Sequence, residues 1–192
     1  NLEKVNIEYV SANPTGPMHI GHARGAVYGD SLANLLEYVG YHITREYYIN
    51  DSGQQIINLA KSVYLRYLEI LNNKKEIFKD NLYPGEYLIP VAQNIINNYG
   101  DQFLNCDEIE WLDTFKKISI SSMMDLIKDD LSSINIHHDV FTSEEFIKSN
   151  GFIEKVVKIL NENNMIYEGV LEPPKGLKKE DWKSRPQLLF KS

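Results

Sequence analysis

The sequence predicts an α/β fold built on a parallel sheet, and three observations support this prediction. Residues 5–10 form a β-type run that is interpreted as a buried strand, and residues 42–49 form a second β-rich run. Between them, apolar side chains recur with helical spacing from about residue 19 to residue 39. A strand, a helix and a strand at this spacing make a βαβ unit, so the two strands are expected to be parallel.

The composition is that of an ordinary globular protein with enough apolar material for a core. Of 192 residues, 43% are hydrophobic and 24% are charged. The net charge of −7 argues against a general nucleic-acid binder, which usually carries a basic patch. The chain has one cysteine, Cys106, which excludes an intrachain disulfide and favours a reducing cytoplasm. No apolar run has membrane-spanning length and no signal-peptide pattern is present, so no membrane association is expected.

The junction between the first strand and the first helix reads Asn-Pro-Thr-Gly-Pro-Met-His-Ile-Gly-His over residues 13–22. The two prolines restrict the backbone and Gly16 permits a tight turn. His19 and His22 are three residues apart, so they share one face of the first helical turn. A helix N-terminus favours an anion, and two imidazoles add donors there. The sequence therefore predicts a phosphate-binding turn, with Gly21 leaving room for a flat ring.

The rest of the chain continues the α/β pattern with one interruption. Helices are expected at about 54–71, 111–133 and 151–163, and strands at 136–141, 165–171 and 187–191, the last two as a hairpin. Between residues 72 and 110 the alternation of strands and helices is interrupted. This indicates a mainly helical insertion with a helix to about residue 98. The first helix is expected to turn these apolar residues toward the core: Ala23, Ala26, Val27, Leu32, Leu35, Leu36 and Val39.

The His137-His138-Asp139 run invites a metal interpretation. Alternation along a strand would send the two histidines to opposite faces, so a shared ion is not expected. Thr142 and Glu145 have the spacing of a capping box for the next helix. The basic residues between 175 and 185 are interpreted as a solvated loop, with a nucleic-acid contact as the alternative.

The stretch over residues 11–24, Ser-Ala-Asn-Pro-Thr-Gly-Pro-Met-His-Ile-Gly-His-Ala-Arg, resembles the ATP-binding signature of class I aminoacyl-tRNA synthetases. Its long lead-in is most similar to that of the arginyl-tRNA synthetases. An Asp-x-Gly-x-Gln at Asp51, Gly53 and Gln55 and a Tyr-x-Gly-x-Tyr at residues 83–87 also resemble features of that family. The resemblance implies an incomplete Rossmann-like class I catalytic core over residues 1–192, with the insertion at about 72–110.

The resemblance also implies roles for particular residues. His19 and His22 match the catalytic histidines, and Glu8, Ser11 and Asn13 match positions that contact arginine. The ATP-binding positions are Thr15, Gly16, His19, Gly21 and His22, and the supporting positions are Asp51, Gly53 and Gln55. The alternatives are a helix cap for the histidines, a solvent-facing strand residue for Glu8 and turn roles for Asn13 and Asp51.

The implied function is ligation of arginine to tRNA(Arg) through an arginyl-adenylate. ATP is a substrate in this scheme, and Mg²⁺ is expected to arrive with it rather than at a dedicated protein site. The lysine-rich Lys-Met-Ser-Lys-type loop of the family is absent, and both ends of the chain read as boundaries within a longer protein. The parent is expected to be monomeric and to bind tRNA mostly through other domains, and the fragment alone is expected to be inactive. The alternatives are a nucleotidyltransferase with a related His-x-Gly-His site and a non-catalytic binding module derived from a synthetase.

Overall fold

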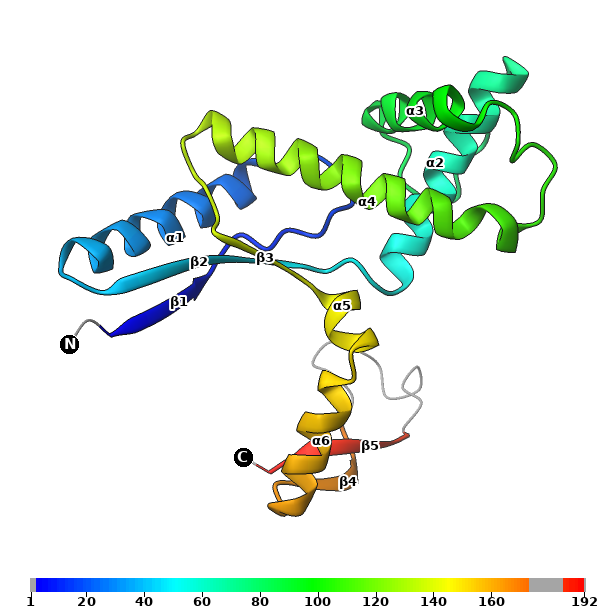
Figure 1. Ribbon diagram of the computed structural model, residues 1–192. Coiled ribbons are helices and arrows are strands. Elements are labelled where there is room, and N and C mark those ends of the chain that lie inside the picture. The colour runs from blue at the N-terminus through cyan, green and yellow to red at the C-terminus, as the bar shows by residue number, and fades with distance from the viewer. Residues whose placement is uncertain (1–2, 173–184, 192) are drawn as a thin grey trace. The chain divides into compact units, whose positions relative to one another are not determined.

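The computed structural model describes residues 3–172 and 185–191, and the chain divides into two compact units (Figure 1). The first unit is Asn1–Glu145 and the second is Phe146–Ser192. Most of the loop predicted between the last two strands, with the lysines of its basic run, lies outside the described residues.

The first unit contains a three-stranded sheet in the order β1-β2-β3. β1 (Lys4–Glu8), β2 (His42–Ile49) and β3 (Val140–Ser143) are all parallel, with Val5 opposite Ile43 and Glu46 opposite Val140. α1 (Ile20–Tyr38) connects the first two strands. The predicted βαβ unit is therefore confirmed, and its parallel strands bring their carboxyl ends to one edge of the sheet.

β3 begins four residues later than the sequence predicts. The chain joins β2 only at Asp139, whose N–H donates to the carbonyl of Arg45 (2.8 Å) while its carboxylate accepts from the Arg45 N–H (2.8 Å). His137 and His138 therefore precede the strand instead of alternating along it. The predicted capping box was also wrong: the Glu145 N–H donates to Asp51, and the Thr142 hydroxyl donates to Glu46.

One face of the sheet is covered by α1 and by the C-terminal half of α4 (Glu108–Ser133), which lie on the same side in Figure 1. Where the two helices pack on the sheet, a core of buried residues forms: Tyr9, Ala26, Tyr47, Met124, Ile127, Leu131 and Ile136. On the opposite face, β1 places Lys4, Asn6 and Glu8, all of which are exposed. The polar face of the sheet thus ends beside the turn that follows β1.

A second core joins the helices beyond the sheet. It is formed by α2 (Gln54–Asn72), the short 3₁₀ helix η1 (Glu86–Leu88), α3 (Ile89–Tyr99) and the N-terminal half of α4. Partly buried Tyr64 packs against this core and stacks on buried Trp111, with ring centroids 4.0 Å apart. The insertion proposed for residues 72–110 contains η1 and α3, and its status as an insertion stays a prediction.

α4 starts three residues earlier than its apolar pattern predicts. Asp107 and Glu110 form a capping box at its N-terminus, which satisfies backbone N–H groups that would otherwise lack partners. The helix therefore begins at Glu108.

The prediction for the buried face of α1 was wrong at its larger residues. Val27, Leu35 and Val39 are 54%, 59% and 61% exposed. The residues that α1 buries are small: Ala26, Gly29 and Ala33. Small side chains let the helix approach the sheet closely, so the larger apolar residues are left on the outer face, which the described part of the first unit does not cover.

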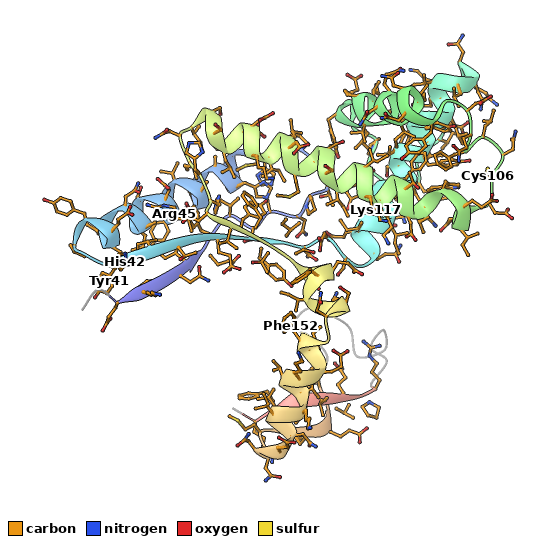
Figure 2. The ribbon with its side chains drawn as sticks, in the orientation of Figure 1. Tyr41, His42, Arg45, Cys106, Lys117 and Phe152 are labelled. Atoms are coloured by element: carbon orange, nitrogen blue, oxygen red, sulfur yellow. The ribbon has the colours of Figure 1, made fainter. Side chains whose placement is uncertain are left out.

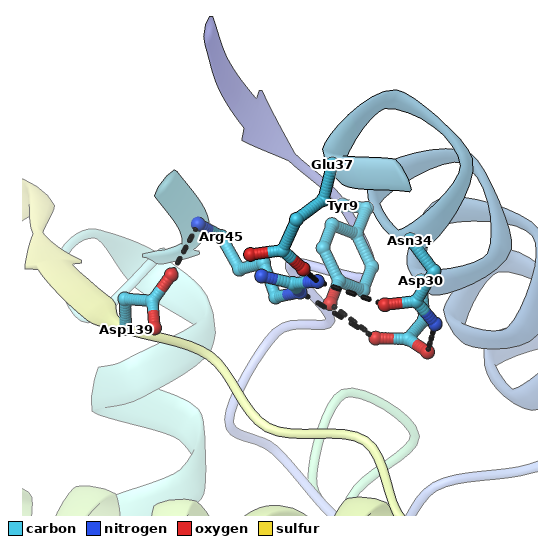
Figure 3. Close-up of polar contacts among 6 residues, drawn as sticks. All are labelled: Tyr9, Asp30, Asn34, Glu37, Arg45 and Asp139. Carbon is cyan, nitrogen blue, oxygen red and sulfur yellow. Dashed lines mark hydrogen bonds and ion pairs between the residues drawn. The ribbon is translucent and has the colours of Figure 1, made fainter. Parts of the chain in front are cut away.

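A polar network fixes α1 to the sheet (Figure 3). Arg45 of β2 donates to Asn34 (2.8 Å) and Glu37 (2.9 Å) of α1, and its guanidinium is 3.8 Å from Asp30. The Tyr9 hydroxyl, just after β1, donates to Asp30 (3.2 Å). Burial, reinforced by the charge of Asp30, raises the Tyr9 pKa to about 12, so this hydroxyl stays a donor at neutral pH.

His138 lies among aromatic rings on the covered face of the sheet. Its ring centroid is 4.3 Å from that of Tyr9 and 5.3 Å from that of Tyr47, which it meets edge-on. Burial lowers the pKa of His138 below its ordinary 6.5, because a charged imidazole would lose hydration among these rings.

This environment predicts acid sensitivity. Because the pKa of His138 is lower in the folded chain, this histidine takes up a proton more readily in the unfolded chain. Its contribution to the free energy of unfolding is therefore fully present above the ordinary pKa of 6.5 and is lost as the pH falls. Urea unfolding should show a lower midpoint at pH 5.5 than at pH 7.5, and His138→Phe should reduce this difference. The exposed neighbour His137 provides the control variant His137→Gln, which should keep it. An unchanged difference in His138→Phe would contradict the prediction.

The described part of the second unit contains most of one short helix, a complete longer helix and a hairpin. α5 (Glu144–Ser149) begins at the junction of the units, and α6 (Phe152–Glu162) follows. β4 (Ile166–Val170) pairs antiparallel with β5 (Pro186–Phe190), so that Ile166 faces Phe190. Every boundary of α6, β4 and β5 agrees with the sequence prediction to within one residue.

Candidate active site

The chain turns sharply where β1 ends. Val10 and Ser11 have φ angles of +67° and +41°, a region that β-branched residues such as valine rarely adopt. The Ser11 N–H donates to the Tyr9 carbonyl (3.0 Å), which closes a tight three-residue turn around Val10. Strained backbone of this kind is concentrated at functional sites, because it persists only where the surroundings hold it.

The following residues, 12–18, are fixed by contacts from distant elements. Buried Tyr47 of β2 donates its hydroxyl to the Ala12 carbonyl (2.8 Å). Asp130 of α4 accepts from the Met18 N–H (3.3 Å). Pro14 is fully buried and lies within a second tight turn, closed by the Thr15 N–H and the Asn13 carbonyl (2.8 Å). The turn is therefore preorganised, as expected for a site that positions a ligand.

The two histidines of the turn stack on each other at the start of α1. Their ring centroids are 3.7 Å apart and the ring planes differ by 18°. His19 is the N-cap residue, and its Nδ1 accepts from the Gly21 N–H (3.1 Å), while the Nδ1 of His22 accepts a longer bond from the His19 N–H (3.4 Å). The capping alternative and a ligand role are therefore compatible.

This bonding selects the tautomer of a neutral ring. Because Nδ1 accepts a hydrogen bond in each ring, the neutral ring carries its proton on Nε2, which can donate to a ligand. Burial, and to a lesser extent the charge of His19, lowers the pKa of His22 below its ordinary 6.5. His22 is therefore a neutral Nε2–H donor at pH 7. A Cβ at Gly21 would lie 3.0 Å from the His19 ring, so glycine is what lets that ring reach the backbone.

The three residues predicted to contact arginine all lie at the carboxyl end of β1. Glu8 is exposed at the end of the strand and accepts a hydrogen bond from the Ser11 hydroxyl. Ser11 Oγ also accepts from the Tyr48 N–H of β2 (2.9 Å). Asn13 donates to Gln55 (2.8 Å) and accepts from Asn50 (3.1 Å).

A second carboxylate lies beside Glu8 and was missed from the sequence. Glu46 is the register partner of Glu8 on β2, and it accepts hydrogen bonds from Thr142 and Asn6. These two bonds hold the pKa of Glu46 below its usual value, so the group stays ionised. The register of the two strands was the signal that could have found it. Two adjacent carboxylates suit a cationic ligand.

The three residues predicted to support the site have different structural roles. Asp51 joins the end of β2 to the end of β3, because it accepts from the Ser143 hydroxyl (2.6 Å) and the Glu145 N–H (2.9 Å). Gly53 precedes α2 with φ of +84°, a conformation that side chains disfavour. Gln55 reaches Asn13 of the turn. The structure thus brings Gln55 into contact with the turn and gives Asp51 a capping role.

The single cysteine lies outside this arrangement. Cys106 is in the loop before α4, at the helical end of the first unit (Figure 2), and its thiol donates to the Gln102 carbonyl (3.2 Å). Partial desolvation and the nearby carboxylates of Glu110 and Asp107 raise the thiol pKa, which disfavours a nucleophilic thiolate.

The residues that the structure describes offer neither a membrane-spanning helix nor a metal-binding cluster. None of their helices combines the length and the apolar character needed to cross a membrane. No three His, Cys, Asp or Glu side chains among them come together as a group that could hold a metal ion.

A parallel sheet with a His-x-Gly-His turn at the start of its first crossover helix is typical of a class I synthetase catalytic domain. The chain belongs to the family described as "tRNA synthetases class I (R), catalytic domain", whose sequence profile matches residues 1–170. This agrees with the resemblance noted in the sequence and with an incomplete Rossmann-like core.

Individual relatives give the same result. The chain is 55% identical over 190 residues to the arginine–tRNA ligase of Rickettsia bellii and 53% identical to that of Roseobacter denitrificans. Each alignment covers 99% of this chain and 33% of the relative. A solved Campylobacter jejuni structure assigned as an arginyl-tRNA synthetase superposes with a TM-score of 0.77 at 35% identity, covering 88% of this chain and 36% of that one. The chain thus spans about a third of the length of these relatives.

Proposed function

We propose that the protein containing this chain is an arginine–tRNA ligase, and that residues 8–22 form the ATP- and arginine-binding wall of its active site. The observation that carries the proposal is the preorganised turn, in which two stacked histidines stand at a helix N-terminus beside a strand that ends in Glu8. The similarity to arginine–tRNA ligases over 99% of the chain supports the choice of arginine.

The proposed reaction has two steps. The carboxylate of arginine attacks the α-phosphorus of ATP, a phosphorus–oxygen bond forms, and pyrophosphate leaves with the electrons of the broken bond. A hydroxyl of the terminal ribose of tRNA(Arg) then attacks the arginyl carbonyl, and AMP leaves. Neither step needs a protein nucleophile, so positioning and charge stabilisation can supply the rate.

Each part of the wall has a proposed role. His19 and His22 donate from Nε2 to the phosphates as negative charge shifts toward the leaving pyrophosphate. Thr15, Gly16 and Gly21 lie along ATP, and the helix N-terminus adds its dipole. Glu8 and Asn13 bind the cationic substrate, with Ser11 holding Glu8 in place. Mg²⁺ would enter with ATP, bound through the phosphates.

The proposal extends to the setting of the whole protein. We infer a cytoplasmic monomer in which tRNA is bound mostly by parts of the parent outside residues 1–192. This assignment is compatible with the net charge of −7, since the main RNA contacts would lie elsewhere. No specific feature of the site favours a nucleotidyltransferase or a non-catalytic module.

The direct test is aminoacylation by the full-length parent. Purified parent, ATP, magnesium and tRNA(Arg) should attach labelled arginine to the tRNA, whereas labelled lysine should not be attached. Failure to charge arginine, or equal charging of lysine, would contradict the proposal.

The arginine contact gives a separate prediction. Glu8→Gln in the parent should raise the KM for arginine roughly tenfold or more, because a hydrogen bond to a charged group contributes about 1.5–3 kcal/mol. The KM for ATP should change little. Pyrophosphate exchange at varied arginine and varied ATP measures both, and Glu3→Gln is the control for an exposed carboxylate near the same strand. A change in the ATP parameter alone would assign Glu8 to another task.

A further inference from the structure

Tyr87 links the helical part of the first unit to the proposed ATP-binding turn. Its hydroxyl donates to the Thr15 carbonyl at 2.8 Å, across a separation of 72 residues. Tyr87 belongs to η1, so this bond reaches from the segment predicted as an insertion to the residues just before His19. The two-step reaction assigns no role to Tyr87, because the Tyr87 hydroxyl binds the backbone of the turn.

Two glycines make room for the Tyr87 ring. A Cβ at Gly16 would lie 2.9 Å from the Tyr87 hydroxyl oxygen and 3.1 Å from Cζ. A Cβ at Gly85 would lie 2.0 Å from Cε1 of the ring. The distances of 2.9 Å and 2.0 Å are too short for an added carbon, so glycine at each position allows the ring to lie against the turn.

The base of Tyr87 is itself held firmly. Leu88, the next residue, is completely buried in the helical core, against which Tyr87 also packs. Arg66 of α2 pairs with Glu69 (2.5 Å) and donates to the Pro84 carbonyl just before η1. Tyr87 therefore joins two well-packed parts of the unit through a single hydrogen bond and a close ring contact.

We propose that Tyr87 is a positioning residue for ATP, which holds Thr15 and Gly16 in the conformation that the nucleotide requires. This inference rests on the proposed function, because it assumes that the turn binds ATP. Tyr87 acts through the turn and does not touch the reacting atoms. Without the hydroxyl, the Thr15 carbonyl loses its tether and the turn must be ordered by ATP itself, at the expense of affinity.

The test compares Tyr87→Phe with Tyr83→Phe in the full-length parent. Tyr83 is the other tyrosine of the same Tyr-x-Gly-x-Tyr motif and is half-buried, so its variant loses the same atom from the same segment. Arginine-dependent pyrophosphate exchange should give a KM for ATP about two- to tenfold higher in Tyr87→Phe. This is the change in affinity that corresponds to the loss of one neutral hydrogen bond. The KM for arginine and the thermal midpoint should stay close to wild type. Tyr83→Phe should match wild type in all three.

A second variant checks the ring contact. Gly16→Ala should raise the KM for ATP, and its effect should be smaller in the Tyr87→Phe background, where the hydroxyl oxygen nearest the new Cβ is gone. Additive effects of the two changes, an unchanged KM in Tyr87→Phe, or an equal rise in Tyr83→Phe would each overturn the proposal. A fall in the thermal midpoint without a change in KM would show a merely structural role and would also overturn it.

Failure of the proposed function has a different signature. In that case the wild-type parent shows no arginine-dependent exchange, whatever happens at Tyr87. Calorimetric titration of wild type and Tyr87→Phe with ATP alone then tests the positioning role by affinity, and equal dissociation constants, or no binding of ATP by wild type, would refute it.

Discussion

Replacing His22 by alanine in the full-length parent should slow arginyl-adenylate formation by ~10²–10³ fold, the usual loss for one preorganised donor. The imidazole of His22 is held by its stack on His19 and is kept neutral, with its Nε2 proton available for a phosphate. Binding of arginine should change little, because the proposed arginine contacts, Glu8 and Asn13, lie at and just after the end of β1 and not on α1. Single-turnover adenylate formation measures the rate, and equilibrium titration measures arginine affinity.

His42→Ala is the matched control, because His42 is an exposed histidine at the start of β2, the opposite end of the strand from the site. It should leave the adenylation rate unchanged. A His22→Ala rate within a few-fold of wild type would remove His22 from the chemistry and leave it as a helix cap.

Gly29→Ala should destabilise the 192-residue chain by about 1–3 kcal/mol, the range for overpacking a core. Gly29 faces the sheet from α1, and a Cβ there would lie 2.3 Å from Cγ of Tyr9. The clash would force α1 away from the residues that lead into the strained turn at Val10. Urea unfolding should show a lower free energy of unfolding.

Gly25→Ala provides the opposite result in the same helix. A Cβ at Gly25 meets nothing within 4 Å among its surroundings, so only the helix preference of alanine over glycine remains. This variant should gain roughly 0.5–1 kcal/mol. If Gly29→Ala were as stable as Gly25→Ala, the close packing of α1 on Tyr9 would be wrong.

The sequence was sufficient for the features that depend on local pattern. The βαβ unit follows from a segment with a strand pattern, a segment with helical periodicity and a second segment with a strand pattern. The shared face of His19 and His22 follows from their helical spacing. The placement of Asn13, His19 and His22 in one turn needed nothing beyond residues 5–39. Sequence resemblance then supplied the roles, which stay predictions until they are tested.

Other features depend on which parts of the chain meet in space. The outer face of α1 has the same periodicity as a buried face, so Leu35 and Val39 read as core residues although they are exposed. The tethers of the turn join residues that are far apart in sequence, as with Asp130 and Met18, 112 residues apart. No periodic pattern marks such side chain to backbone bonds. The Tyr-x-Gly-x-Tyr motif identified Tyr87 as notable, but only the folded structure shows that it contacts Thr15.

The most direct test of the central claim is a crystal structure of the full-length parent with a non-hydrolysable arginyl-adenylate analogue. We expect the adenine to pack against Gly21, the adenylate phosphate mimic to lie near His19 and His22, and the arginyl group to contact Glu8 and Asn13. Binding of the analogue at a place remote from residues 8–22 would contradict the account.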